Sequence, residues 1–164
     1  MTPVSSPELS ASLPELSTRI SAFTSAEHEV YLTLQRVAID LAYQTAELLK
    51  AADLSAPQFN VLRILRGAHR DGLTCGEIGG RMLTRDPDVT RLLDRLEKQG
   101  LVTRVRSRQD RRVVLACITE RGQAVLAGID EPLAQQHRAQ LGHLGPQKLS
   151  QLLTLLREAA SAPG

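Results

Sequence analysis

The chain has few of the features that mark secreted, membrane-spanning or disulfide-stabilised proteins. It has only two cysteines in 164 residues, Cys75 and Cys117, which cannot form a disulfide framework. No run reaches the roughly 18 consecutive apolar residues of a membrane span. The N-terminal segment also lacks the basic and apolar regions of a signal peptide. We therefore expect a cytoplasmic protein that makes no contact with membranes.

Motifs for metal binding and catalysis are missing as well. The four histidines show no ligand spacing such as i, i+4 on one helix. The sequence has no nucleotide-binding glycine loop, no nucleophile elbow and no His-Glu metal motif. We expect no metal, no cofactor and no catalytic residue, and hence no enzyme. An apolar content of 42% is nevertheless enough for a folded core.

Positive charge is concentrated in one segment of a chain whose net charge is only +2. Residues 81–112 hold ten Arg and Lys against five Asp and Glu, and nine of the ten cations are arginines. Such a local surplus indicates an anionic partner. Because no long apolar span flanks these arginines, nucleic acid is favoured over a membrane surface.

Capping signals divide the chain into helices. A Ser or Thr followed three residues later by Glu or Gln can cap a helix N-terminus reciprocally. This spacing occurs at Thr24 with Glu27, at Ser55 with Gln58 and at Thr74 with Glu77. Residues 1–23, which are rich in Ser and Pro, predict a mobile arm before the first helix.

A further helix and a hairpin follow in the basic segment. Asp86 as N-cap and Pro87 at the first helical position predict a helix that ends at Gly100. Residues 101–118 contain two short β-branched runs around an arginine-rich stretch, which predicts a hairpin. A short helix, a turn and a second helix with a cationic outer face are typical of a helix-turn-helix, and the hairpin after it is typical of a wing.

The terminal helices carry apolar stripes that the central module does not need for its own core. We expect a second copy of the chain to cover them. The predicted fold class is therefore mainly α (α+β), with a winged helix-turn-helix core between long dimerisation helices. The predicted segments are the arm 1–23, an N-terminal dimerisation helix 24–54, the DNA-binding module 55–118 and C-terminal dimerisation helices 119–164. In the last helix we expect burial of Leu149, Leu152, Leu153, Leu156 and Ala160.

Residues 92–122, LLDRLEKQGLVTRVRSRQDRRVVLACITERG, resemble the signature of the MarR family. The matches are Asp94-Arg95-Leu96, Gly100-Leu101-Val102, the Asp110-x-Arg112 pair, and Ile118-Thr119 followed by Gly122. A looser likeness extends the match over roughly residues 28–160. The resemblance implies a homodimeric transcriptional regulator that binds a pseudo-palindromic operator in double-stranded DNA. It also implies a recognition helix in the major groove, a wing at the minor groove, and often repression relieved by a small phenolic or other effector.

The predicted DNA contacts lie on the second helix of the helix-turn-helix and on the wing. Arg91 and Arg95 lie four residues apart, where like charges repel in an isolated helix, and a phosphate or guanine opposite them would explain the pair. Asp88, in an unusually acidic start for the family, either caps the helix or accepts a hydrogen bond from cytosine N4. A merely solvated face is the alternative for the arginines. The full predicted set is Arg85, Asp88, Thr90, Arg91, Arg95, Arg104, Arg106, Arg108, Arg111 and Arg112.

Two further assignments follow from the resemblance. The wing pattern implies that Asp110 pairs with Arg112 and sets its direction. The family's effector pocket would lie between the dimer helices and the helix-turn-helix, with Leu41, Phe59 and Leu62 as candidates from their helical positions. Two other functions stay open: a redox-responsive regulator that uses Cys75, and a protein-interaction module with the same fold and weak DNA affinity.

Overall fold

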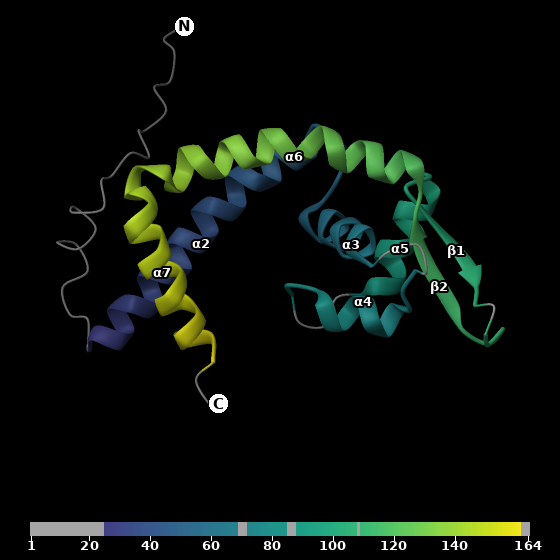
Figure 1. Ribbon diagram of the computed structural model, residues 1–164, viewed down its shortest axis with the longest axis horizontal. Helices are drawn as coiled ribbons and strands as arrows, with labels where there is room; N and C mark the ends of the chain where they lie inside the picture. Colours follow the sequence, from purple (N-terminus) through teal and green to yellow (C-terminus); the bar gives the residue numbers. More distant parts are fainter. Residues whose placement is uncertain (1–24, 69–71, 85–87, 108, 162–164) are drawn as a thin grey trace, which may run out of the picture. The chain divides into compact units, whose positions relative to one another are not determined.

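The computed structural model describes residues 25–68, 72–84, 88–107 and 109–161. Its helices and strands follow the predicted order, with one short 3-10 helix added (Figure 1). They are α2 (Ala26–Lys50), α3 (Ala56–Gly67), α4 (Cys75–Arg81), α5 (Val89–Lys98), β1 (Val102–Arg106), β2 (Val114–Ile118), α6 (Glu120–Leu141), η2 (Gly142–Leu144) and α7 (Gly145–Ala160). The predicted fold class, mainly helical with one hairpin, is confirmed.

The chain divides into two compact units, residues 1–40 and 41–164, with the boundary inside α2. In the first unit Ser25 caps α2, because its hydroxyl accepts the backbone amide of His28 at 3.3 Å. The predicted cap, Thr24, lies outside the described residues. Val30 lies in the segment 24–54, whose apolar stripe we expect a second copy to cover, and it is 57% exposed. The stripe on this part of α2 is therefore open in the single chain.

Both capping boxes predicted in the second unit are present. The Ser55 hydroxyl accepts the Gln58 amide, and the Gln58 side chain accepts the Ser55 amide at 2.9 Å. Thr74 and Glu77 make the same reciprocal pair at the start of α4. Each box satisfies backbone donors that a helix N-terminus otherwise leaves without partners. The two helix starts are thus set by local sequence.

The core of this unit lies between α3, α4, α5, the hairpin and the first half of α6. Leu62, Ile78, Leu93 and Leu96 are fully buried in it, and so is Leu126. The short helix α4 contains Gly79 and Gly80, which lower its intrinsic helix propensity by about 1 kcal/mol each relative to Ala. Packing of its one buried side chain, Ile78, explains why it is helical nonetheless.

The wing is an antiparallel hairpin in which Val102 pairs with Ile118 and Arg106 pairs with Val114. Leu73, just before α4, exchanges backbone hydrogen bonds with Ala116 of β2 at 3.0 and 2.8 Å. This bridge connects the beginning of the helix-turn-helix to the base of the wing. The helix-turn-helix and the wing are therefore joined by backbone hydrogen bonds.

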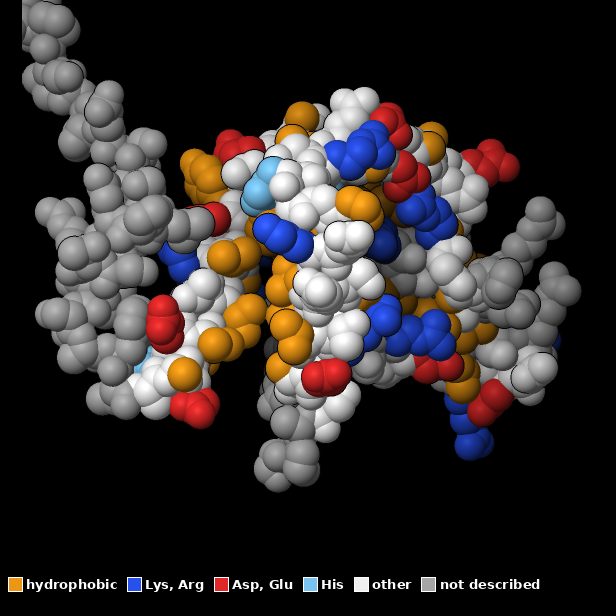
Figure 2. All heavy atoms as spheres, turned by 60° about the vertical axis from the view of Figure 1, so that its left-hand side comes forward, with side chains coloured by type: hydrophobic (Ala, Val, Ile, Leu, Met, Phe, Trp, Pro, Cys, Tyr) orange, Lys and Arg blue, Asp and Glu red, His pale blue; other side chains and the backbone are white. Residues whose placement is uncertain are grey.

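The last helix carries the apolar stripe that we expect a second copy of the chain to cover. No residue of α7 is buried in the single chain, and Leu153, Leu155 and Leu156 are 48%, 63% and 40% exposed. Figure 2 shows exposed hydrophobic side chains in orange on the molecular surface. Burial of this stripe by a second copy stays a prediction. Separately, no described helix is long and apolar enough to cross a membrane.

Candidate nucleic-acid interface

The outward face of α5 presents the polar side chains expected there. The apolar stripe of the helix is buried, with Val89 at 7% exposure and Leu93 and Leu96 at 0%. The helical repeat consequently turns Arg91 and Arg95 to solvent. Thr90 is exposed at the edge of the same face. Burial of the apolar stripe in the core therefore orients this polar face toward solvent in the single chain.

The turn between α4 and α5 is held by a residue that the sequence did not single out. The amide oxygen of Asn60, on α3, accepts the backbone amide of Leu83 at 3.0 Å. A polar residue between the buried Phe59 and Val61 is the one sequence signal that could have indicated this contact. At the other end of α4, hydrogen bonds from the Thr74 amide, and then from its hydroxyl, hold the pKa of Glu77 below its usual value. Both ends of α4 are thereby held in place.

Asp88, and not Asp86, is the N-cap of α5. Its carboxylate accepts the Arg91 amide at 3.1 Å, and the helix begins at Val89. Asp86 lies outside the described residues. The physical reason for the start at Val89 is that its side chain is buried in the core while the Asp88 carboxylate accepts the Arg91 amide. Of the two roles predicted for Asp88, the capping role is confirmed.

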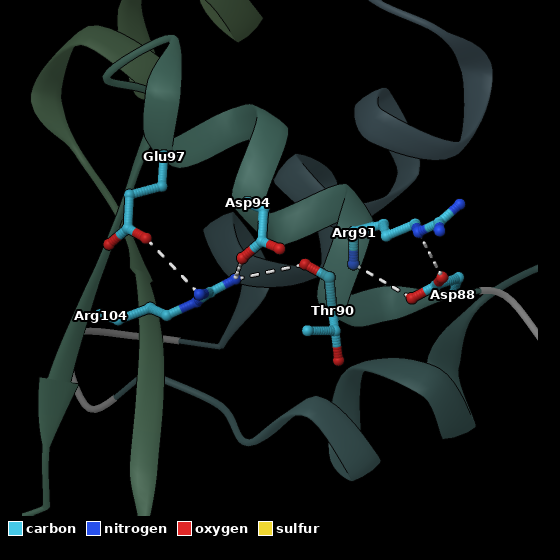
Figure 3. A network of polar contacts seen from close by, with 6 residues as sticks. All are labelled: Asp88, Thr90, Arg91, Asp94, Glu97 and Arg104. Carbon is cyan, nitrogen blue, oxygen red and sulfur yellow. Dashed lines mark hydrogen bonds and ion pairs between the residues drawn. The ribbon is translucent and has the colours of Figure 1, made fainter.

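Asp88 also forms an ion pair with the side chain of Arg91, at 3.3 Å between Oδ2 and Nε (Figure 3). Both side chains are largely exposed, at 60% and 79%, so the pair itself is weak in water. Its effect is to bias Arg91 toward the N-terminal end of the helix. The guanidinium still has donors left for a further partner.

The tip of the wing is organised by backbone contacts of Asp110 and Ser107. The Asp110 carboxylate accepts the backbone amide of Arg112 at 2.9 Å, and the Ser107 hydroxyl accepts the amides of Gln109 and Asp110. The expected pairing of Asp110 with Arg112 is thus made through the main chain. Asp110 shapes the turn and leaves the exposed guanidinium of Arg112 for solvent or a partner.

Arg104 differs from the other wing arginines, because its guanidinium is turned toward α5. It contacts Asp94 at 2.6 Å, and only 26% of its side chain is exposed. Arg106, two residues further along β1, is exposed, and its guanidinium donates to the carbonyl of Arg111 at 3.4 Å. Arg104 and Arg106 lie two residues apart on β1 and therefore on the same face of the strand, but their guanidinium groups have different partners.

The structure brings most of the predicted contact residues onto one module. Thr90, Arg91 and Arg95 lie on α5, and the exposed arginines of the wing follow on β1 and at the hairpin tip. Arg104 is the exception, since α5 occupies its guanidinium. Arg85 and Arg108 lie outside the described residues.

The candidate effector residues do not line the hollow found at the start of α3. This hollow has a volume of about 420 Å³ and is formed by Ala46, Lys50, Asp53, Leu54, Ser55, Ala56 and Gln58. Phe59 and Leu62, in contrast, are 7% and 0% exposed and belong to the core, and Leu41 is half-buried on α2. An effector pocket between the dimer helices and the helix-turn-helix, with Leu41, Phe59 and Leu62 as candidates, stays a prediction.

Polar contacts connect that hollow to the end of α5. Gln58 donates from its side chain to the Gln99 amide oxygen at 3.3 Å, and Gln99 donates to the carbonyl and the carboxylate of Asp53, both at 3.1 Å. Gln99 is the C-cap of α5, and Asp53 has a positive φ of 53°. A wall of the hollow is therefore bonded to the last turn of the predicted recognition helix.

Cys75 is the first residue of α4 and is exposed. A redox role for Cys75 stays a prediction. Within residues 25–68, 72–84, 88–107 and 109–161, no group of three or more His, Cys, Asp or Glu side chains is arranged to hold a metal ion.

Comparisons with known proteins agree with this geometry. Residues 54–114 match the model of the MarR family. The uncharacterised HTH-type transcriptional regulator YfiV of Bacillus subtilis is 30% identical over 125 residues, which cover 76% of this chain and 77% of that protein. The crystal structure of a MarR transcription factor from Planctomyces limnophilus is 39% identical with a TM-score of 0.64, covering 83% of this chain and 98% of that one.

A DNA-bound structure is also similar. A cysteine-to-serine mutant of MarR from E. coli, complexed with operator DNA, is 26% identical with a TM-score of 0.74. The match covers 85% of this chain and 99% of that one. This coverage is larger than that of residues 54–114, which match the family model. This chain therefore belongs to the MarR family and is a helix-turn-helix transcriptional regulator.

Proposed function

We propose that this protein is a homodimeric repressor that binds a pseudo-palindromic operator in double-stranded DNA and is released by a small-molecule effector. The observation that carries the proposal is the cationic surface formed by the exposed Arg91 and Arg95 on α5 and by Arg111 and Arg112 at the tip of the wing. A helix of this kind fits the major groove, while arginines on a hairpin fit the narrow, strongly negative minor groove.

The homodimer is supported by the exposed apolar residues of the terminal helices. Leu153 and Leu156 lie on one face of α7, and Val30 and Leu34 form a similarly exposed stripe on α2. Exposed leucines at helical spacing favour association with a second apolar surface. A second copy offers the same stripes, and a two-fold dimer presents two recognition helices to two half-sites.

Binding to DNA can be tested with a salt series on the selected operator and on a random duplex. Arg91→Ala should weaken operator binding by about 1–3 kcal/mol and random binding less, if Arg91 contacts a base. Arg112→Ala should weaken both and lower the salt slope by about one unit per lost phosphate contact. Arg138→Ala is the matched control, because this arginine pairs with Glu131 on α6, away from the cationic surface.

The proposed interface requires that Arg91 and Arg112 each contribute to DNA affinity. If Arg91→Ala and Arg112→Ala both bind like the parent at every salt concentration, this surface does not bind DNA. If the Arg138→Ala control loses affinity as much as they do, the effect is one of net charge. The parent must also show salt-dependent affinity for random DNA, as a groove-binding surface requires.

Repression and its release form the part of the proposal that needs a promoter. A dimer seated on promoter DNA blocks transcription, so a reporter under the selected operator should be silent until an effector is added. Phenolic acids are the first probes, because the family resemblance implies them. A compound at 100 times its dissociation constant should stabilise the folded protein by about 2.7 kcal/mol, which a thermal shift detects. Gln58 lines the hollow at the start of α3, so a smaller thermal shift in Gln58→Ala would indicate that the effector binds in this hollow.

A further inference from the structure

Arg104 of β1 lies against one edge of α5 (Figure 3). Its Nη2 contacts Asp94 Oδ1 at 2.6 Å and donates to the Thr90 carbonyl at 3.3 Å, while Nη1 lies 3.5 Å from Glu97 Oε2. The three partners occupy positions i, i+4 and i+7, which form one row on a helix. A single guanidinium thus connects the wing strand to two turns of α5.

Burial distinguishes this contact from the other ion pair on the same helix. The Arg104 side chain is 26% exposed, compared with 79% for Arg91. A half-buried pair is less screened by water and salt than an exposed one. Guanidinium also presents several donors in a rigid plane, so it can satisfy two carboxylates and a carbonyl together, whereas an ammonium is a single point of charge.

The strand that carries Arg104 is itself held from the other side. Arg104 pairs in register with Ala116, and Ala116 exchanges backbone hydrogen bonds with Leu73 at the start of α4. The base of the wing is therefore attached to both helices of the helix-turn-helix. Three residues beyond Arg104 along the chain, Ser107 begins the turn at the tip of the wing.

We propose that Arg104 is a positioning residue that sets the wing tip relative to α5 and thereby determines how well the protein separates its operator from other DNA. Arg104 does not itself bind DNA in this assignment. The inference rests on the proposed DNA-binding function and deepens it. Asp94 and Glu97 are the partners of Arg104 in this role. The positive charge of Arg104 also offsets the repulsion between these carboxylates and DNA phosphates.

Asp94→Asn is the decisive variant. A simple charge effect and a positioning role of Arg104 predict opposite changes in its DNA binding. If charge alone mattered, Asp94→Asn would remove a negative charge beside the DNA and tighten binding to every duplex. If Arg104 positions the wing through Asp94, Asp94→Asn should instead lower the ratio of operator to random affinity. We expect a loss of about tenfold in that ratio, similar for Asp94→Asn and Arg104→Ala.

The experiment measures operator and random-duplex affinities over a salt series for Asp94→Asn, Arg104→Ala, Arg104→Lys and the double variant. The inference expects the double variant to lose no more than either single one, because the two residues act as one unit. It expects no change of salt slope, and no rescue by Arg104→Lys. Two results together would overturn the inference. Arg104→Ala would lose affinity equally for operator and random DNA, with a salt slope lowered by about one unit, and Asp94→Asn would bind both more tightly. They would mean that Arg104 contacts a phosphate.

Hydrogen exchange of the free protein tests the same coupling without DNA. Arg104→Ala and Asp94→Asn should speed exchange of the β1 and β2 amides, while Arg138→Ala should leave it unchanged. Unaltered exchange in both variants would refute the positioning role even if the protein bound DNA poorly. If the parent shows no salt-dependent DNA binding but the exchange changes as expected, the proposed function fails while the contact between wing and helix stands.

Discussion

Gly122 shows how a single residue of the family signature is dictated by close packing. A Cβ at this position would lie 2.4 Å from the Leu101 carbonyl oxygen and 2.8 Å from a side-chain carbon of Ile118. The first turn of α6 therefore rests directly on the backbone at the start of β1. We predict that Gly122→Ala lowers the free energy of unfolding by about 1–3 kcal/mol, because the backbone must shift to admit the methyl group.

Gly128 is the matched control, since it lies on the same helix and a Cβ added there would meet no atom of the described residues within 4 Å. Gly128→Ala should raise stability by about 0.5–1 kcal/mol through helix propensity alone. Urea denaturation measures both variants. Equal effects of the two substitutions would show that the contact with Leu101 is unimportant.

Asp88 combines a stabilising cap with a charge that opposes DNA. We predict that Asp88→Ala costs about 0.5–2 kcal/mol of stability through loss of the cap. Asp88→Asn keeps an oxygen for the Arg91 amide, so it should retain most of that stability and bind DNA more tightly. Unfolding and DNA-binding measurements on both variants separate the two effects. Weaker binding by Asp88→Asn would indicate that the carboxylate itself contacts a base.

At the scale of elements, α3 and α6 are joined by a two-pronged ion pair. Arg66 donates to both carboxylate oxygens of Asp130, at 2.7 and 3.0 Å, and this bonding holds the pKa of Asp130 below its usual value. The side chains are 37% and 48% exposed, so the pair contributes no more than about 1 kcal/mol. It adds a polar contact between α3 and α6 beside their shared apolar core.

The pH dependence of this pair has a definite sign. Because the folded-state pKa of Asp130 is lowered, the stabilisation is fully present above its unfolded pKa of about 4 and disappears as the pH falls through the lower folded value. We predict that Asp130→Asn is less stable than the parent at about pH 6 and that the difference shrinks toward zero in acid. Denaturation curves from neutral to strongly acidic pH test this. A gap that persists at the acid end would contradict the assignment.

The whole molecule is predicted to depend on α7 for assembly. Leu156→Arg places a charge in the exposed leucine face and should give a monomer at micromolar concentration in sedimentation. Operator affinity should then fall by about 100-fold or more, because two linked half-sites no longer bind together. Gln151→Arg, on the opposite face of the same helix, is the control and should remain dimeric. A dimeric Leu156→Arg variant would place the interface elsewhere.

Local sequence was sufficient for the starts of α3 and α4, for the hairpin and for the helix-turn-helix, but it placed the start of α5 two residues too early. The capping boxes at Ser55 and Thr74 and the buried stripe of α5 depend on neighbours three or four residues away, so the chain's own periodicity predicts them. The signature in residues 92–122 likewise predicted the family, which the match of residues 54–114 to the MarR model confirms.

Tertiary structure alone decided which partners the functional side chains have. Arg104 faces Asp94 only because β1 packs beside α5, a relation between residues ten apart that no periodicity encodes. The same holds for Asn60, which reaches the turn at Leu83, and for the hollow at α3, whose walls come from two helices and the turn between them. Periodicity gives the side of a helix on which a residue lies, whereas the approach of another element decides what that side meets.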